Sequence, residues 1–327
     1  MATTIVNLAT SVDLFRRNFA STNKNKMKIT LTGSLGNISK PLAIELVQKG
    51  HTLTVISSKA ERQKDIEDIG AKAAIGSMQD AGFLAETFKG ADIVYVMETL
   101  GERSRFSGQD IDVISAIAKI GENYKHAITQ SGVKQVVHLS SIGAHTDKGN
   151  GMLAFHYKVE QILHQLPADV SIKFMRPVGF YYNMLAFIPT IKGQGVIVSN
   201  YGGDDKEPWV SPLDIAAVIA EEMEKPFEGR TIRYIASEEL SPNEVAGILG
   251  EAIGKPDLKW VVISDEQMLN GMIAAGMNPN VAKGMVEMNE GRRGNVLYED
   301  YNRHKPTLGK TKLKDWVNVF AKAYNKN

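Results

Sequence analysis

The stretch ITLTGSLGNISKPLAIELVQKGHTLTVIS (Ile29–Ser57) is the strongest indication of the fold. It begins with an apolar run typical of a β-strand, turns on Gly33 and Gly36, and continues as an amphipathic helix that ends at Gly50. A second strand pattern follows. A strand, a glycine turn, a helix and another strand make up a βαβ unit, which predicts a parallel sheet.

The same alternation of strand and helix patterns extends to Pro177, and one more strand pattern lies further on. The strand patterns cover residues 28–33, 52–57, 72–76, 92–97, 134–140, 171–177 and 231–236. The helical patterns between them cover about 38–48, 60–69, 82–88, 109–130 and 151–165. We therefore predict an α/β fold with a doubly wound parallel Rossmann sheet.

The pattern changes after Arg176 and Pro177, where Gly, Pro, Tyr and Met become prominent. Helical patterns near 243–252, 265–275 and 311–324, the first with an N-cap at Ser241, indicate a mostly helical C-terminal third. We predict a Rossmann domain over 27–180 with a return segment at about 208–237. A smaller substrate lobe would comprise 181–207 and 238–327. Residues 1–26 are interpreted as a targeting segment, a disordered tail, or sequence upstream of a natural start at Met27.

The composition is that of an ordinary globular protein and excludes several function classes. Of 327 residues, 43% are hydrophobic and 23% charged, and the formal net charge is +1, so the whole chain has no general attraction for nucleic acid or anionic membranes. The absence of cysteine excludes disulfides, thiol catalysis and cysteine-ligated metals. No apolar run approaches the roughly 18 residues of a membrane-spanning helix. We expect a cytoplasmic protein that binds a small molecule.

The glycine turn is typical of a phosphate-binding loop. Gly33 suits the tight turn, and Gly36 lets the backbone approach a pyrophosphate at the helix N-terminus, where free N–H groups and the helix dipole favour negative charge. Ser39 stands where the dinucleotide fingerprint has its third glycine or alanine. Glycines are common at helix starts, but the position between the first strand and the first helix favours a binding loop. The predicted contacts are Gly33, Ser34, Leu35, Gly36, Asn37 and Ile38.

The end of the second strand indicates which dinucleotide would bind. An acid there would bind the ribose 2′-hydroxyl of NAD(H), whereas this chain has Ser57, Ser58 and Lys59, with Arg62 one turn further on. Hydroxyls and cations favour a 2′-phosphate, so NADP(H) is preferred, with NAD(H) as the alternative cofactor. Lys59 and Arg62 could equally be exposed cations at a helix start. Ser77 and Met78, after the third strand, are predicted to border the adenine.

Several motifs together resemble the NmrA-like group of atypical short-chain dehydrogenases/reductases. They are TGSLGNIS, GADIVYVM, GVKQVVHLSS, FHYKVEQIL, FMRPVGFYYNM and PWVSPLDIAAVIA, and they span most of the chain from Met27 onwards. The resemblance implies NAD(P) bound on a Rossmann domain with a small C-terminal substrate lobe.

One departure from the wider family affects catalysis. Ordinary short-chain dehydrogenases have a serine, a tyrosine thirteen residues later and a lysine four beyond that. Here these positions are Ser141, Ala154 and Lys158, so the tyrosine that acts as acid/base is missing. Tyr157 lies about 100° from Lys158 around a helix and cannot simply replace it. Tyr157 and the nearby His156 could both be packing residues. Lys158 is predicted to hold the nicotinamide ribose.

Further candidates follow the fourth and sixth strands, at the edge where doubly wound sheets bind ligands. Met97 and Glu98 are predicted to contact the cofactor and Thr99 the substrate. After the sixth strand, the resemblance places Pro177, Val178 and Gly179 near the nicotinamide. Phe180, Tyr181 and Asn183 are predicted to line a substrate pocket, and Tyr182 and Phe187 could add stacking, although aromatic clusters more often form cores. The loop 200–205 either covers the site or is an ordinary connection. No metal site is expected.

Two functions fit these features. The first is an NADP(H)-dependent oxidoreductase that transfers hydride to a quinone-like or other small carbonyl acceptor, since such acceptors can take their proton from water. The second, which some members of the resembled group represent, is a non-catalytic redox sensor that acts through a regulatory protein partner. The sequence also leaves open whether the protein forms a homodimer.

Overall fold

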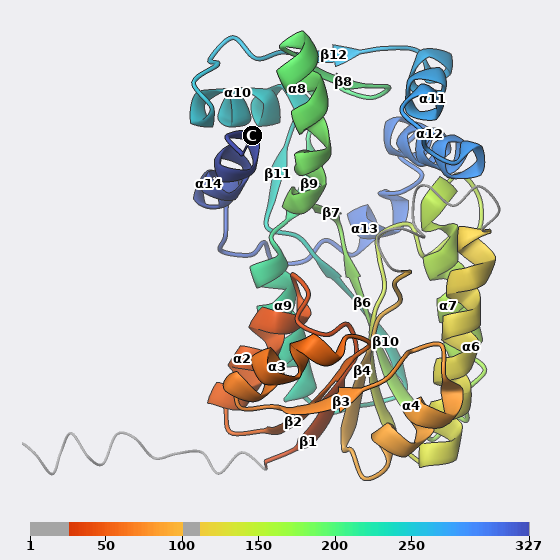
Figure 1. Ribbon diagram of the computed structural model, residues 1–327. Coiled ribbons are helices and arrows are strands. Elements are labelled where there is room, and N and C mark those ends of the chain that lie inside the picture. The colour runs from red at the N-terminus through yellow and green to blue at the C-terminus, as the bar shows by residue number, and fades with distance from the viewer. Residues whose placement is uncertain (1–25, 101–111, 327) are drawn as a thin grey trace, which may run out of the picture.

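The computed structural model describes residues 26–100 and 112–326, and its centre is a seven-stranded sheet in which all neighbours are parallel. The strand order is β10-β6-β5-β4-β1-β2-β3 (Figure 1). This is the Rossmann order with one further strand at the edge, which confirms the predicted fold class. The strands are β1 (Lys28–Leu31), β2 (Thr52–Ser57), β3 (Lys72–Ile75), β4 (Ile93–Val96), β5 (Gln135–Leu139), β6 (Ser171–Pro177) and β10 (Arg230–Ile235).

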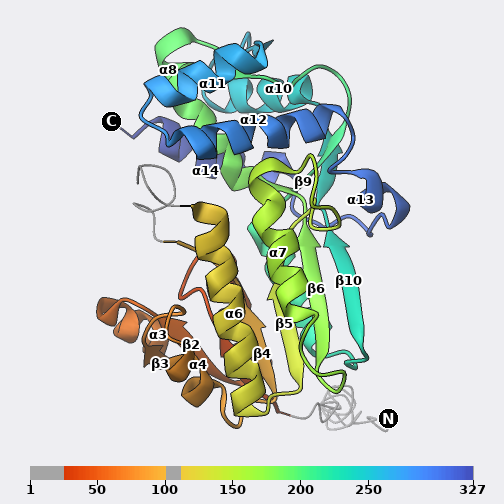
Figure 2. The same cartoon turned by 90° about the vertical axis from the view of Figure 1, so that its right-hand side faces the viewer.

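Helices cover both faces of the sheet. Apolar side chains of α2 (Ser39–Gln48) and α9 (Pro212–Met223) pack with β1 and β2 in one core. On the other face, α4 (Ala81–Phe88), α6 (Val113–Ser131) and α7 (Ala154–Leu163) form a second core, and α6 and α7 lie side by side (Figure 2). Burial on both faces explains why strands such as IVYV are continuously apolar.

The helix boundaries follow local capping chemistry. Asp80 and Asp112 cap α4 and α6 by accepting a backbone N–H, and Gly132 ends α6 in the left-handed conformation. The predicted helix over 60–69 is a 3₁₀ turn (Ala60–Arg62) followed by α3 (Gln63–Asp68). The predicted helix over 151–165 likewise starts as a 3₁₀ turn (Gly151–Leu153). Residues 109–111 of the predicted helix at 109–130 lie outside the described residues.

Apart from α9 and β10, the segments that follow β6 form a mostly helical region above the carboxyl ends of the strands (Figures 1 and 2). Its core contains Trp260, Trp316 and Phe320. Its helices are the 3₁₀ segment Tyr181–Phe187, α8 (Ile188–Gln194), α10 (Pro242–Ala252), α11 (Asp265–Ala274), α12 (Pro279–Arg293), α13 (Glu299–Arg303) and α14 (Leu313–Tyr324). Its strands are β7 (Gly179–Phe180), β8 (Ile197–Ser199), β9 (Glu207–Val210), β11 (Glu238–Leu240) and β12 (Trp260–Val262). The exact domain limits proposed from the sequence stay a prediction.

Two short sheets support this region. Strands β11, β9 and β7 form one, with β9 central, and β12 pairs with β8 in the other. Gly179 in β7 pairs with Trp209 in β9, so this sheet continues directly from the end of β6. Across the described ranges 26–100 and 112–326, no helix has both the length and the apolar character needed to cross a membrane.

Candidate functional site

The glycine loop lies at the carboxyl end of β1. Gly33 adopts a φ of +86°, and a Cβ at this position would lie 2.8 Å from Ser39 Oγ and 3.0 Å from Met97 Sδ, so only glycine fits. Ser34 also has a positive φ, of +54°. Its N–H donates to the carbonyl of Ile56 at 3.0 Å, which fixes the loop against the end of β2. The loop is therefore held by β2 and bordered by Met97 after β4.

The loop presents free backbone donors at the start of α2. The first turn of α2 contains no acidic residue, and Ile38 at its N-cap makes no side-chain capping bond. Among the described residues, no hydrogen-bond acceptor faces the N–H groups of Leu35, Asn37 and Ile38. Unpaired N–H groups and the positive end of a helix dipole favour an anion. The loop thus fits a phosphate group.

Ser39 performs a structural task at the third fingerprint position. Its side chain is buried, and Oγ donates a 3.2 Å hydrogen bond to the carbonyl of Thr32 at the end of β1. The hydroxyl of Thr32 in turn accepts the N–H of Met97 at 2.9 Å. Serine therefore joins helix α2 to the strand end instead of leaving the gap that glycine would leave.

Among the polar residues at the end of β2, one is buried and hydrogen-bonded and the others are exposed to solvent. Ser57 is buried, and its Oγ accepts from Ser34 Oγ at 3.0 Å and from the N–H of Lys59 at 3.2 Å. Ser58 and Lys59 are exposed beside the loop. Arg62 is also exposed, and its guanidinium lies 3.0 Å from the carboxylate of Asp65. Lys59 is thus the cation placed nearest in sequence to the strand end.

The segments after β3 and β4 are held by α6. Asn123 Nδ2 donates to the carbonyl of Met78 at 3.3 Å, and the Tyr124 hydroxyl donates to the carbonyl of Met97 at 2.6 Å. Ser77 is half-buried, and its Oγ accepts the N–H of Gln79. These bonds fix Ser77, Met78 and Met97 along the carboxyl edge of the sheet, where they were predicted to contact the cofactor.

The Glu98 side chain is buried. Its carboxylate oxygens lie 3.1 and 3.2 Å from Nε2 of His138 on β5, and neither side chain has exposed surface. The Glu98 side chain therefore belongs to a buried pair that joins the segment after β4 to the end of β5. Thr99 beside it is half-buried. No local pattern could have indicated this pairing, because 40 residues separate the two partners.

The positions that match the catalytic residues of short-chain dehydrogenases lie at the start of α7. Ala154 is the first residue of α7, and Lys158 is exposed one turn later. Hydrogen bonds from Ser115 lower the pKa of Asp112, and the charge of Lys158 adds to this shift, which places Lys158 near the N-terminus of α6. Ser141 is half-buried. The structure thus has a serine shortly after β5 and a lysine within α7 at the matching positions, with alanine in place of the tyrosine.

The neighbours of these residues have structural partners. Ser140 donates to Glu160, which forms a bidentate ion pair with Arg176 at 3.0 and 2.6 Å. His156 stacks on Phe155 with ring centroids 4.0 Å apart. Burial and the charge of His138 hold the pKa of His156 well below its ordinary value. His156 is therefore a neutral packing residue rather than a charged group at the site.

The residues after β6 fall into two groups. Gly179 and Phe180 are half-buried and Asn183 is exposed, whereas Pro177 and Val178 are buried. Tyr181 has no exposed surface; its hydroxyl donates to Glu238 at 2.5 Å and its ring packs 5.8 Å from that of Trp316. This position contradicts the prediction that Tyr181 lines a substrate pocket. The rings of Tyr182 and Phe187 likewise pack on Trp316 and Trp260, as a core would require.

Sequence reasoning missed a polar cluster beside Gly179. Arg292 Nε donates to Glu207 Oε2 at 2.8 Å, and the Tyr298 hydroxyl donates to the same oxygen at 2.6 Å. The guanidinium stacks over Tyr201 and Trp209, 4.3 and 5.1 Å from their ring centroids. No local pattern could have indicated this cluster, because it joins the start of β9 to the end of α12.

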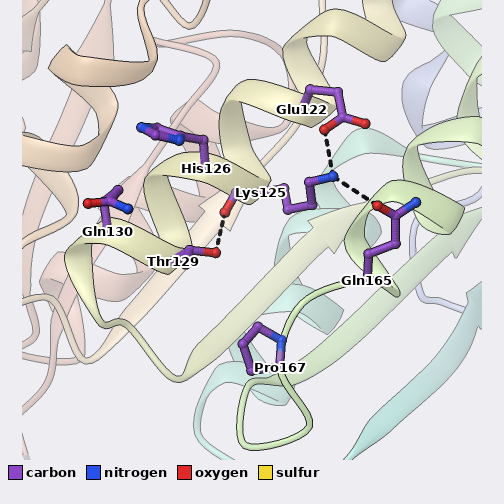
Figure 3. A pocket seen from close by; sticks show the side chains of 7 residues that line it. All are labelled: Glu122, Lys125, His126, Thr129, Gln130, Gln165 and Pro167. Carbon is purple, nitrogen blue, oxygen red and sulfur yellow. Dashed lines mark hydrogen bonds and ion pairs between the residues drawn. The ribbon is translucent and has the colours of Figure 1, made fainter.

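A hollow of about 480 Å³ beside α6 is separate from the candidate site (Figure 3). It is lined by Glu122, Lys125, His126, Thr129, Gln130, Gln165 and Pro167. These residues lie on the C-terminal half of α6 and just before β6, at the amino ends of the strands. Ligands of doubly wound sheets bind at the carboxyl ends, so this hollow is no part of the candidate site.

Comparison with known proteins shows a family, relatives and solved structures that this chain resembles. The model of the NmrA-like family matches residues 25–315. An NAD(P)H azoreductase of Xenophilus azovorans is 24% identical over 80% of this chain and 85% of the enzyme. The crystal structure of an NADPH-dependent quinone oxidoreductase from Escherichia coli, complexed with NADPH, superposes with a TM-score of 0.71 at 17% identity, covering 89% and 99% of the two chains. A Citrobacter triphenylmethane reductase complexed with NADP(H) gives 0.68 at 18%, covering 90% and 99%.

Proposed function

The chain belongs to the NmrA-like family, and from this premise we propose that it binds NADP(H) and reduces a quinone-like or other small carbonyl acceptor. The observation that supports the proposal most directly is the glycine loop, with its unpaired N–H groups at Leu35, Asn37 and Ile38 at the start of α2. These donors would hold the pyrophosphate. Ser58 and Lys59, exposed at the end of β2, would hold the 2′-phosphate.

The remaining predicted contacts would orient the other half of the cofactor. Lys158, exposed at the start of α7, would donate hydrogen bonds to the nicotinamide ribose. The backbone around Met97 and Gly179 would border the nicotinamide ring, because both residues lie at carboxyl ends of central strands. When bound, NADPH supplies a hydride, and the protein's task is to bind and orient it.

The acceptor class follows from the residue that is absent. Ala154 occupies the tyrosine position, so the phenol with which ordinary short-chain dehydrogenases exchange a proton with an alcohol is missing from that position. Oxidation of an ordinary alcohol needs such a positioned base. A quinone or similar activated acceptor can take its proton from water. The azoreductase and quinone oxidoreductase among the similar proteins support a reductase of activated acceptors.

A titration followed by a turnover assay tests the proposal. The purified protein would be titrated with NADPH and NADH, and NADPH consumption would then be followed with a panel of quinones and aldehydes. We expect tighter binding of NADPH than of NADH, and turnover with quinones. Tight binding without turnover of any acceptor would favour the redox-sensor function instead. Absence of dinucleotide binding would overturn both functions.

A further inference from the structure

The C-terminal segment after α12 packs on the loop that leads to Ala154. A Cβ on Gly143 would lie 3.0 Å from Leu297 and 3.3 Å from Leu153, which directly precedes Ala154. A Cβ on Gly291 would lie 2.1 Å from the carbonyl of Gly149. Helix α12 and the turn after it are thus in close contact with loop 143–153, two residues beyond Ser141. This packing places Tyr298, the neighbour of Leu297, beside the start of α7.

Tyr298 is partly exposed and packs on the apolar core between the sheet and helices α2 and α9. Leu35 of the glycine loop, Met97 after β4, Leu153 and Phe180 are partly buried side chains that pack on the same core. The Tyr298 hydroxyl is bonded to Glu207, two residues before Trp209, which pairs with Gly179. The Tyr298 side chain therefore runs from the loop that precedes α7 to the pair formed by Glu207 and Arg292, and Arg292 Nη2 lies 3.6 Å from a Cβ built on Gly179.

The hydroxyl of Tyr298 is held by groups that are themselves fixed. Glu207 Oε2 accepts from both Tyr298 and Arg292, and the Arg292 guanidinium is stacked on Tyr201 and Trp209. Arg292 and Glu207 are nearly buried, with side chains 11% and 8% exposed. A carboxylate that bonds a phenol and a guanidinium together restrains the ring to one orientation.

We propose that Tyr298 is a specificity-determining residue of the acceptor site, whose ring, locked by Glu207 and Arg292, forms the wall on which a flat aromatic acceptor stacks. The proposal rests on the proposed function, because it assumes that the acceptor lies over the nicotinamide. Offset or edge contacts between aromatic rings favour a flat acceptor over an aliphatic one. A restrained ring also loses little freedom when the acceptor binds.

Tyr298 does not replace the missing acid/base tyrosine. Its hydroxyl already donates a hydrogen bond to the Glu207 carboxylate. Burial raises the pKa of Tyr298 well above its ordinary value, and Glu207 adds to this against the opposing charge of Arg292. Loss of the phenol proton would place two negative oxygens together. The role of Tyr298 is therefore to bind and orient the acceptor, and the proton comes from water.

Binding of a flat quinone to the NADP⁺-loaded protein tests this role without turnover. Anthraquinone-2-sulfonate would be titrated calorimetrically into the wild type and into Tyr298→Ala, Tyr298→Phe and Glu207→Gln variants. We expect the Kd for the quinone to be about tenfold higher in Tyr298→Ala than in the wild type. It should be about threefold higher in Tyr298→Phe and Glu207→Gln, which keep the ring but weaken or remove its hydrogen bond to residue 207. Tyr324→Ala, a partly buried tyrosine on α14, is the matched control and should bind like the wild type.

The NADPH affinity separates this proposal from the proposed function. Each variant should bind NADPH within about twofold of the wild type, since none of them changes the glycine loop, Ser58, Lys59 or Lys158, which are proposed to hold the cofactor. Equal quinone affinity in Tyr298→Ala and the wild type would overturn the role of Tyr298. A wild type that binds NADP⁺ but not the quinone would overturn the flat acceptor class. A wild type that binds no dinucleotide would instead overturn the proposed function.

Discussion

Nε2 of His138 lies 3.1 Å from Oε2 of Glu98, and both side chains are completely buried between the sheet and the helices α6 and α7. Each group loses water on folding and has the other as its partner. The pair also connects β5 to the segment directly after β4, which borders the proposed nicotinamide position. A change in either residue is therefore expected to affect both stability and the shape of this strand end.

Replacement of Glu98 by alanine should reduce the free energy of unfolding by about 3 kcal/mol at pH 7, because the buried His138 imidazole would lose its partner. Urea denaturation measures this loss. Asp169→Ala is the matched control, since Asp169 forms an exposed ion pair with Lys134 at 2.6 Å. Such exposed pairs contribute little to stability, because solvent screens them. Similar losses in the two variants would show that Glu98 is not buried with His138.

Gly36→Asp should abolish dinucleotide binding. Gly36 is exposed in the loop before α2, and a carboxylate there would repel a pyrophosphate held by the unpaired N–H groups. Calorimetric titration with NADPH measures the effect. Gly193→Asp, at an open glycine position in α8, is the control and should bind NADPH like the wild type. Unchanged NADPH affinity in Gly36→Asp would contradict the proposed position of the pyrophosphate.

Lys59→Glu should weaken NADPH about tenfold and change NADH much less, because only NADPH carries the 2′-phosphate that an exposed Lys59 would face. The ratio of the two dissociation constants is the quantity to measure. Lys64→Glu makes the same charge change at an exposed position on α3, and its ratio should match that of the wild type. An equal loss for both cofactors in Lys59→Glu would place Lys59 away from the 2′-phosphate.

Ser39→Ala should cost about 1 kcal/mol of stability and leave the NADPH affinity within about twofold of the wild type. The lost interaction is the buried hydrogen bond from Ser39 Oγ to the carbonyl of Thr32. The alanine keeps the small volume that the Gly33 contact requires. Thermal unfolding and NADPH titration together test this role. A large loss of NADPH affinity would instead indicate that the Ser39 hydroxyl contacts the cofactor.

The parts of the structure that follow from local pattern could be predicted from the sequence. The parallel sheet follows from alternating strands and helices of ordinary length, and the loop at Gly33 follows from its place after the first strand. Short elements gave no such signal. Strand β7 has two residues and β11 has three, too few for a periodic pattern.

Contacts between distant segments account for the rest. Glu207 and Tyr298 are 91 residues apart, and Glu207 and Arg292 are 85 apart, so only the fold brings them together. Tyr181 shows the opposite difficulty, because an aromatic residue after the sixth strand can face either a ligand or a core. Its contact with Trp316 on α14 decides for the core, and that helix lies more than a hundred residues away in the sequence.

The stability of the protein should fall as the pH drops below about 6.5, partly through His156. Burial and His138 hold the pKa of His156 well below its ordinary value, so the folded chain keeps it neutral while the unfolded chain binds a proton. Burial also lowers the pKa of His145 and His164. The stabilising effect is complete above the unfolded pKa and is lost as the pH falls towards the folded one. Each such histidine adds a slope of at most about 1.4 kcal/mol per pH unit.

Urea denaturation of the wild type and of His156→Gln, measured from about pH 7.5 to about pH 5, isolates this contribution. This range includes the pKa of histidine in the unfolded chain, about 6.5. Below about pH 6.5, the free energy of unfolding of the variant should fall less steeply as the pH drops, by the equivalent of about one bound proton. Above that pH, the curves of the variant and the wild type should run parallel. His126→Gln, on the exposed face of α6, is the matched substitution. A wild-type slope in His156→Gln would mean that the folded protein protonates His156 as readily as the unfolded chain does. That result would contradict the buried packing of His156 against Phe155 in α7.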